Sequence, residues 1–202
     1  DKLIRMVHIR DTGTSFENIL DNSKANSGGE QDLSFLRRLI SNNLLETKEF
    51  ALKRTVTDIN EEYYQEKYRK MNYESTRHYL CRAVIQEELK KLGINNTCCV
   101  DVGNMDLLRS NSSYDIAADD LSFIIDVGLT PARNFFKGLS DLRVGYYLVT
   151  TYFDDYMDDI VFFALRRTND ELFLKELSGY KEEYRELVPE SIETLLSDKL
   201  PF

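Results

Sequence analysis

The sequence lacks features that mark several broad classes of protein. It has no run of 18 apolar residues and no basic, apolar and small-residue succession at its start, so no membrane span or export signal is predicted. Its three cysteines include the adjacent pair Cys98 and Cys99 but no C-x-x-C spacing, which indicates neither a zinc site nor a disulfide framework. We therefore expect a reducing compartment, with the thiols acting as small buried hydrophobic groups.

Signatures of several enzyme classes are also missing. His8 and His78 are the only histidines and no nucleophile elbow is present, so Ser/His/Asp catalysis is not expected. There is no glycine-rich phosphate loop. The 26 basic residues are outnumbered by 35 acidic ones, and the net charge of −9 argues against binding nucleic acid through bulk electrostatic attraction. The same charge suits a site that gathers carboxylates around a divalent metal.

The size and composition indicate one compact domain. The 202 residues suffice to bury a sizeable core, and a chain that is 42% hydrophobic and 30% charged is ordinary for a globular protein. The chain opens on Asp1 rather than Met, so we expect it to be a fragment of a longer protein. Within it we predict an N-terminal helical region over residues 1–72 and a core over residues 73–202.

Hydrophobic spacing predicts most of the helices. An apolar stripe follows Asp32, which we expect to be an N-cap after a polar loop at 12–30, and Gly93 is placed to end a later helix. A strongly polar stretch with three tyrosines predicts an exposed helix at 58–71. The expected helices cover about 32–44, 58–71, 73–92, 131–156 and 180–199.

Shorter apolar runs predict strands between these helices. They cover residues 97–101, 114–117, 121–127, 160–165 and 171–175. The alternation predicts an α/β (α+β) fold with a mixed central sheet flanked by helices.

A hairpin with an acid at each end is the most informative stretch. Its arms flank the turn at Asp119 and Asp120; Asp115 begins the first arm and Asp126 closes the apolar second arm. A charge beside a core must be paired or must bind a metal. The alternative is that Asp126 caps the helix that Pro131 opens.

Two further residues join these acids as candidate ligands. His78 stands at the N-terminal end of the buried face of the 73–92 helix, where a hydrogen-bonded core histidine is the alternative, and Asp101 ends a predicted strand. Carboxylate oxygens with one imidazole suit Mg²⁺ or Mn²⁺, and the imidazole favours Mn²⁺. Two such ions roughly 4 Å apart can bind the attacking and leaving oxygens of a phosphodiester displacement. The helix after Asp126 offers Lys137 as a cation for the transition state, with Arg133 and Arg143 near it.

These motifs, in their order over residues 73–175, resemble a known nuclease family. Thr76-Arg77-His78 resembles an Ala-Arg-His helix motif, Tyr114-Asp115 stands in the place of Pro-Asp, and Phe123–Asp126 resembles a Tyr-Ile-Ile-Asp strand. Asp126–Thr130 is similar to the Glu-Ile-Gly-Val-Thr of the influenza enzyme, eleven residues after the first acid. The family is the cap-snatching endonuclease at the polymerase N-terminus of segmented negative-strand RNA viruses, with a PD-(D/E)xK nuclease core.

The resemblance implies a set of site residues. The implied metal ligands are His78, Asp101 (with Asp106 as its rival), Asp115, Asp126 and the carbonyl of Val127. The lysine of an Asp-x-Lys motif is absent because Gly128 occupies that position. Several relatives carry this lysine on the following helix, which makes Lys137 the catalytic candidate and Arg143 the reserve.

The resemblance also implies a function. The expected activity is two-metal cleavage of host capped, single-stranded RNA to prime viral transcription, by a monomeric domain attached to the remainder of the viral polymerase. It would act in the host cytoplasm and the virion, without a membrane. A PD-(D/E)xK nuclease acting on DNA remains an alternative. A non-catalytic interaction domain, whose acids only cap helices and strands, is another and predicts no saturable Mn²⁺ binding.

Overall fold

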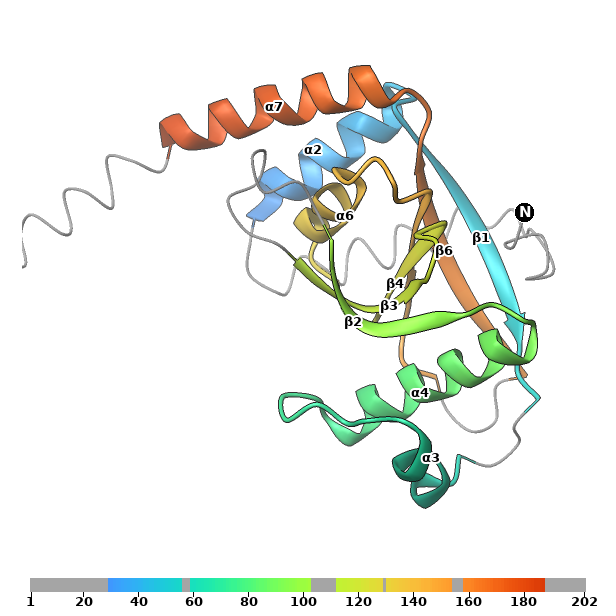
Figure 1. Cartoon of the computed structure of the whole chain (residues 1–202). Helices are drawn as coiled ribbons and strands as arrows, with labels where there is room; N and C mark the ends of the chain where they lie inside the picture. The colour runs from blue at the N-terminus through green and yellow to red at the C-terminus, as the bar shows by residue number, and fades with distance from the viewer. Residues whose placement is uncertain (1–28, 56–58, 103–111, 129, 154–157, 188–202) are drawn as a thin grey trace, which may run out of the picture.

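The computed structural model describes residues 29–55, 59–102, 112–128, 130–153 and 158–187. A six-stranded mixed sheet lies between helices on both faces, as predicted (Figure 1). The strands, in the sheet order β1-β6-β5-β4-β3-β2, are β1 (Leu45–Lys53), β6 (Asp159–Arg167), β5 (Tyr146–Thr150), β4 (Phe123–Val127), β3 (Ser112–Ala118) and β2 (Asn96–Val102). The helices of the described ranges are α2 (Gly29–Ser41), α3 (Glu61–Lys67), α4 (Thr76–Lys91), α6 (Ala132–Leu139) and α7 (Asp170–Leu187).

The strands pair antiparallel except at one place. β4 and β5 run parallel, so the chain must cross back along one face of the sheet between them, and α6 makes this crossing. Beside this parallel pair, β3 and β2 lie beyond β4 on one side, and β6 and β1 lie beyond β5 on the other. The carboxyl end of β4 therefore lies in the interior of the sheet.

The sheet separates two hydrophobic cores. α3 and α4 cover one face, where Ile85 and Leu89 share a cluster with Ile125, and α2, α6 and α7 cover the other face, where Phe135 shares a cluster with Ile124 (Figure 1). Because both faces of β4 are covered, all five of its residues are buried, and its sequence is apolar apart from Asp126 rather than alternating.

The predicted helix and hairpin around the candidate site are confirmed. The 73–92 helix is α4, whose N-cap Ser75 accepts a hydrogen bond from the His78 N–H, and Gly93 follows it with a φ of 73°. The two arms of the predicted hairpin are β3 and β4.

The predicted helix over 131–156 is wrong beyond Leu139. α6 ends there, and the chain turns and enters β5, whose five residues are all buried. Phe135, Leu139 and Tyr146 have helical spacing, but a strand covered on both faces is also continuously apolar, so spacing cannot separate the two. Gly145 permits the turn, since a Cβ there would lie 2.6 Å from the Ser122 carbonyl oxygen.

The N-terminal prediction also needs correction. Residues 1–72 do not form a purely helical region, because β1 pairs with β6 along its whole length and completes the sheet. Its charged sequence, LETKEFALK, is typical of an edge strand, and such charges hide the strand pattern. α2 begins at Gly29, so Asp32 lies in its first turn rather than at the N-cap.

Three smaller expectations fail for reasons of packing. The exposed helix at 58–71 is the shorter α3, and both Tyr64 and Tyr68 are buried. The predicted strand at 171–175 is the first part of α7, because Phe173 and Leu177 are one helical turn apart and pack into the core. Of the three cysteines, Cys81 is buried, but Cys98 and Cys99 are only half-buried.

Some expectations fall on residues that the structure does not describe. These are the first 28 residues of the predicted N-terminal region, which include most of the loop at 12–30, and the end of the 180–199 helix. None of the helices in the described ranges has the length and hydrophobicity that crossing a membrane requires.

Candidate metal centre

Asp115 and Asp126 lie side by side where the β3–β4 ladder stops. The strands pair through Ile116 with Ile125 and through Ala117 with Ile124. Beyond these pairs the carboxylates replace the backbone acceptors: the Val127 N–H donates to Asp115 Oδ2 at 2.7 Å, and the Asp115 N–H donates to Asp126 Oδ1 at 3.4 Å. Each acid thus bonds the strand of the other, which fixes both carboxylates at one end of the hairpin.

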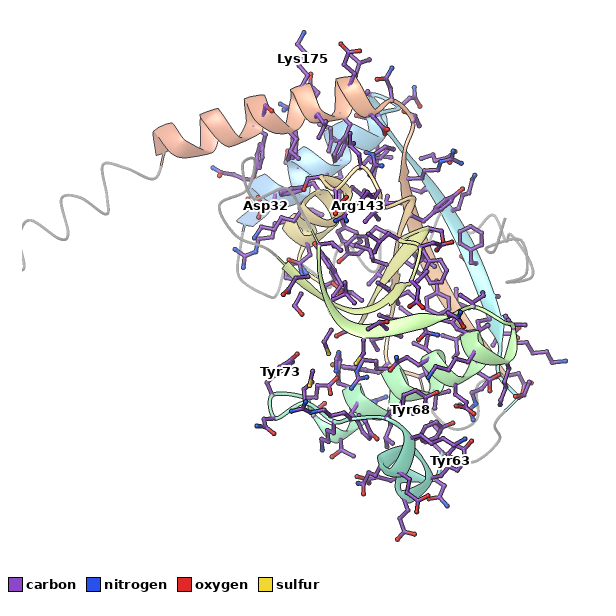
Figure 2. All side chains as sticks on the ribbon, viewed as in Figure 1. Asp32, Tyr63, Tyr68, Tyr73, Arg143 and Lys175 are labelled. Carbon is purple, nitrogen blue, oxygen red and sulfur yellow. The ribbon has the colours of Figure 1, made fainter. Side chains whose placement is uncertain are left out.

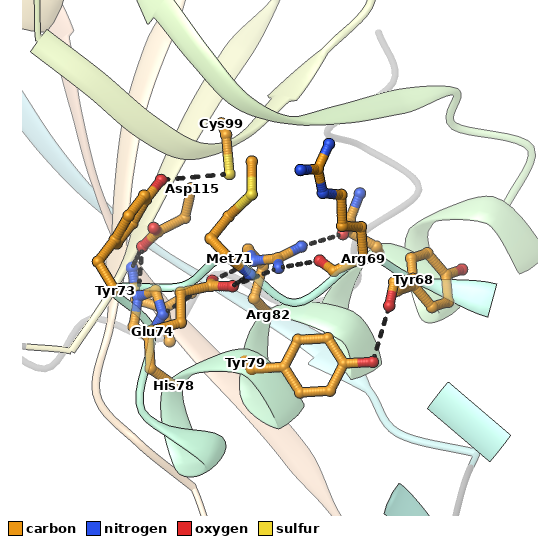
Figure 3. A network of polar contacts seen from close by, with 12 residues as sticks. Tyr68, Arg69, Met71, Tyr73, Glu74, His78, Tyr79, Arg82, Cys99 and Asp115 are labelled. Carbon is orange, nitrogen blue, oxygen red and sulfur yellow. Dashed lines mark hydrogen bonds and ion pairs between the residues drawn. The ribbon is translucent and has the colours of Figure 1, made fainter. Parts of the chain in front are cut away.

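His78 reaches the first of these acids from α4. Its Nε2 lies 3.0 Å from Asp115 Oδ2, and its Nδ1 lies 3.1 Å from Glu74 Oε1 (Figure 3). The hydrogen bond to Asp115 raises the pKa of His78, although burial opposes the shift. The ring therefore stands between two carboxylates.

Glu74 belongs to a buried ion pair with Arg82. The Arg82 Nε donates to Glu74 Oε1 at 2.6 Å, and the side chains are 0% and 1% exposed. Burial alone would raise the pKa of Glu74, but hydrogen bonds from Arg82 and from the Met71 N–H outweigh burial and lower it. Glu74 is therefore held as a carboxylate.

Asp126 is the most strongly perturbed acid of the site. Burial, followed by the charge of Asp115, raises its pKa to about 7, against opposing hydrogen bonds that include those of Tyr147 and Asn134. The Tyr147 hydroxyl donates to Asp126 Oδ2 at 2.5 Å from the neighbouring strand β5. A cation beside Asp126 would relieve both the burial of its charge and the repulsion from Asp115.

The donor atoms fit a hard or borderline divalent ion. Single ligand atoms of Glu74, His78 and Asp115 lie within 4.8 Å of one another. Two ligands at right angles about an ion, with bonds of roughly 2.1 Å, stand about 3 Å apart, and His78 Nε2 and Asp115 Oδ2 are 3.0 Å apart. Their side chains are 16% and 20% exposed, so an ion can reach them from solvent.

Gly128, just after β4, leaves room for the aromatic ring of Tyr152. Gly128 has a φ of +100°, and a Cβ there would lie 2.8 Å from the ring of Tyr152. The Tyr152 ring also stands edge-on to His78, with 6.1 Å between ring centroids, and the Arg77 guanidinium lies 5.4 Å from its centroid. The residue after Asp126-Val127 is thus restricted to glycine by space and by backbone conformation.

The remaining predicted ligands are placed less closely. Asp101 is exposed on the edge strand β2, opposite Ser113 of β3. It is therefore diagonal to Asp115, and such diagonal positions are roughly 7–8 Å apart. The structure does not bring Asp101 into the cluster of Glu74, His78 and Asp115. Val127 contributes its N–H, as described above, and Asp106 lies outside the described residues.

The two predicted cations lie in different places. Burial and the nearby Arg133 lower the pKa of Lys137, while Asp32 opposes the shift, which places Lys137 among the charges of α2 and α6. Arg143 forms a two-pronged ion pair with Asp141 in the turn before β5. The start of β5 pairs with the start of β4, so Arg143 is at the opposite end of β4 from Asp126.

Several residues of the site escaped sequence reasoning. Glu74 is four residues before His78 and eight before Arg82. This spacing puts all three side chains on one side of α4 and of the residues just before it. The sequence therefore offered this spacing as a signal for Glu74. The sequence carried no signal for Tyr147 as a site residue, because its strand was predicted to be a helix.

Comparisons with protein-family models, with curated proteins and with solved structures found no match to this chain.

The burial of Asp126 predicts a pH-dependent stability in the absence of metal. Its pKa rises from 3.8 to about 7 on folding, so the folded state binds more protons than the unfolded state between these values. The free energy of unfolding should therefore fall as the pH rises through this window and should not recover above it. Asp126→Asn, which removes the buried charge, should melt higher than wild type at pH 8 by on the order of several degrees.

Thermal unfolding in chelator at pH 4.5 and pH 8 measures this effect. The increase in melting temperature of Asp126→Asn over wild type should be small at pH 4.5, where Asp126 is protonated in the folded wild type. Asp119→Asn, in the exposed turn of the hairpin, is the matched control and should not change with pH in this way. An Asp126→Asn protein that melts below wild type at pH 8 would contradict the expectation.

Proposed function

We propose that this chain is a metal-dependent endoribonuclease that cleaves single-stranded RNA. The observation that supports it best is the convergence of His78, Asp115 and Asp126 at the end of a buried hairpin. In the cap-snatching enzymes that the motifs resemble, this arrangement cuts host capped RNA into primers for viral transcription. We extend the proposal to that role, with the remainder of a viral polymerase as partner in the host cytoplasm and the virion.

Some residues of the site would bind the metal ions, and others orient the carboxylates that do so. His78 and Asp115 would hold one ion through Nε2 and Oδ2, and Asp126 would contribute to a second position beside Asp115. Mn²⁺ or Mg²⁺, when bound, supplies an activated water and charge stabilisation at the phosphodiester. The Val127 N–H orients the Asp115 carboxylate, and the Tyr147 hydroxyl orients that of Asp126.

A non-catalytic interaction domain is the second candidate. The mutual bonds of Asp115 and Asp126 stabilise the frayed end of the hairpin, and a purely structural role would need no more than this. The hydrogen bonds to Asp126 compensate its buried charge only in part, however, and an ion beside it would compensate the remainder. Saturable metal binding separates the two candidates.

Metal should stabilise the fold, with Mn²⁺ more effective than Mg²⁺. At a hundredfold excess over Kd the gain is about 2.7 kcal/mol, or roughly 5–10 °C in melting temperature for a domain of this size. Asp115→Asn should abolish most of the shift, and His78→Ala should reduce the Mn²⁺ shift more than the Mg²⁺ shift. Asp119→Asn should keep the wild-type response. An unchanged wild-type melting curve in millimolar Mn²⁺ would refute the metal site.

Cleavage should depend on the same acids. With saturating Mn²⁺ and a single-stranded RNA, Asp115→Asn and Asp126→Asn should each lose at least about a hundredfold in rate, because each removes a charge from the centre. Asp119→Asn should remain active. A DNA strand of the same sequence should be cut more slowly; equal or faster cutting of DNA would favour the DNA-processing alternative. Metal binding without cleavage of either strand would refute the nuclease activity but leave the metal site in place.

Lys137 is the proposed cation for the transition state. Asn134, which bonds Asp126, is one helical turn before Lys137, and helix side chains lean towards the N-terminus, so the ammonium can extend towards the acid. Lys137→Ala should keep the Mn²⁺ thermal shift, since an ammonium is no ligand, while RNA cleavage falls at least about a hundredfold.

Two other cations serve as controls for this variant. Lys175 extends away from the sheet on α7 (Figure 2), and Arg143 is at the far end of β4. Lys175→Ala and Arg143→Ala should both retain wild-type cleavage. Full activity in Lys137→Ala would remove α6 as the source of the catalytic cation, and a loss confined to Arg143→Ala would transfer the role to that residue.

A further inference from the structure

We infer that Glu74 is a positioning residue that acts on the metal through His78, and that Arg82 holds Glu74 in place. The inference rests on the proposed metal centre and deepens it. The proximity of Glu74, His78 and Asp115 alone would make all three ligands. The contacts of Glu74 assign it a different role.

All hydrogen-bonding capacity of the Glu74 carboxylate is in use. Its Oε1 contacts Arg82 Nε at 2.6 Å and His78 Nδ1 at 3.1 Å. Its Oε2 accepts from an Arg82 terminal nitrogen and from the Met71 N–H, both at 2.8 Å. A carboxylate offers about four lone-pair positions, so a metal ion could bind Glu74 only by displacing one of these partners.

Arg82 makes such a displacement costly. Its side chain is fully buried, and its other donors bond the Arg69 carbonyl oxygen (Figure 3) and Gln86 Oε1, both at 2.9 Å. Gln86 in turn donates to Asn96 on β2 at 3.1 Å. Removing Glu74 from this network would leave a buried guanidinium without its counter-charge. Glu74 is therefore fixed where it is.

The fixed carboxylate determines how His78 faces the site. A bond from Nδ1–H to Glu74 leaves Nε2 directed at Asp115, and a carboxylate behind a histidine ligand increases the basicity of the coordinating nitrogen. The Ser75 hydroxyl oxygen accepts a hydrogen bond from the backbone N–H of His78, and the Tyr152 ring packs edge-on against the imidazole. Glu74 is 1% exposed and Asp115 is 20% exposed, so an ion approaches from the Asp115 side.

Glu74→Gln tests the role through a double-mutant cycle. If Glu74 acts through His78, the Kd for Mn²⁺ should rise roughly 10- to 100-fold in Glu74→Gln, and the same change in a His78→Ala background should have little further effect. Glu87→Gln is the matched control, because Glu87, on α4, also has a carboxylate that accepts a hydrogen bond, from Tyr68. It should bind Mn²⁺ as wild type does.

The outcomes separate failure of this inference from failure of the metal site. No saturable Mn²⁺ binding by wild type refutes the proposed centre itself. Wild-type affinity in Glu74→Gln overturns the inference alone. An equal further loss in the His78→Ala background makes Glu74 a ligand in its own right and also overturns it.

A measurement on the wild-type side chains covers the case in which Glu74→Gln does not fold. The imidazole ¹⁵N shifts of the Zn²⁺-loaded protein report which nitrogen carries the metal, and Zn²⁺ is diamagnetic. With only two histidines in the chain, His8→Ala assigns the signals. Metal on Nε2 with a proton on Nδ1 is expected; metal on Nδ1 would overturn the inference.

Discussion

The mutual hydrogen bonding of Asp115 and Asp126 is the constraint around which the rest of the structure is arranged. Two carboxylates can meet in the interior of a sheet only where the backbone ladder ends and each finds an N–H on or near the opposite strand. The end of β4 provides this place, since α4 covers one face, α6 covers the other and β5 supplies the Tyr147 hydroxyl. The packing fixes the acids but leaves the charge of Asp126 poorly compensated.

Charge balance explains how an acidic protein can be expected to bind RNA. The net charge is −9, and Arg82, which is buried beside His78 on α4, is neutralised by Glu74. Under the proposed function, the attraction for phosphate at the centre would come mainly from bound ions rather than from a basic surface. Under the proposed function, affinity for substrate and occupancy of the metal site become one property, because the ions that relieve Asp115 and Asp126 are those that contact the phosphate.

The parts predicted from the sequence are those that local chemistry determines. The β3–β4 hairpin has a polar turn between apolar arms, and α4 has a cap and a terminal glycine, so both could be predicted along with the approach of His78 to Asp115. β1 and β5 could not, because a charged edge strand and a strand buried on both faces each lack the alternating pattern. The pair of Glu74 and Arg82 was missed because a buried ion pair has the same composition as a solvated helix face.

The ion pair of Glu74 and Arg82 also helps to hold the site in place at the end of the β3–β4 ladder. The end of β3 and β4 has few ladder hydrogen bonds, and unpaired strand ends are ordinarily the less stable parts of a sheet. The Arg82 network connects the loop before α4, the helix itself and the edge strand β2, so it holds His78 from the helix side. The proposed ligands are thus positioned from two directions, by the strands and by the buried ion pair. A metal centre needs this because ligand geometry must be set before the ion binds.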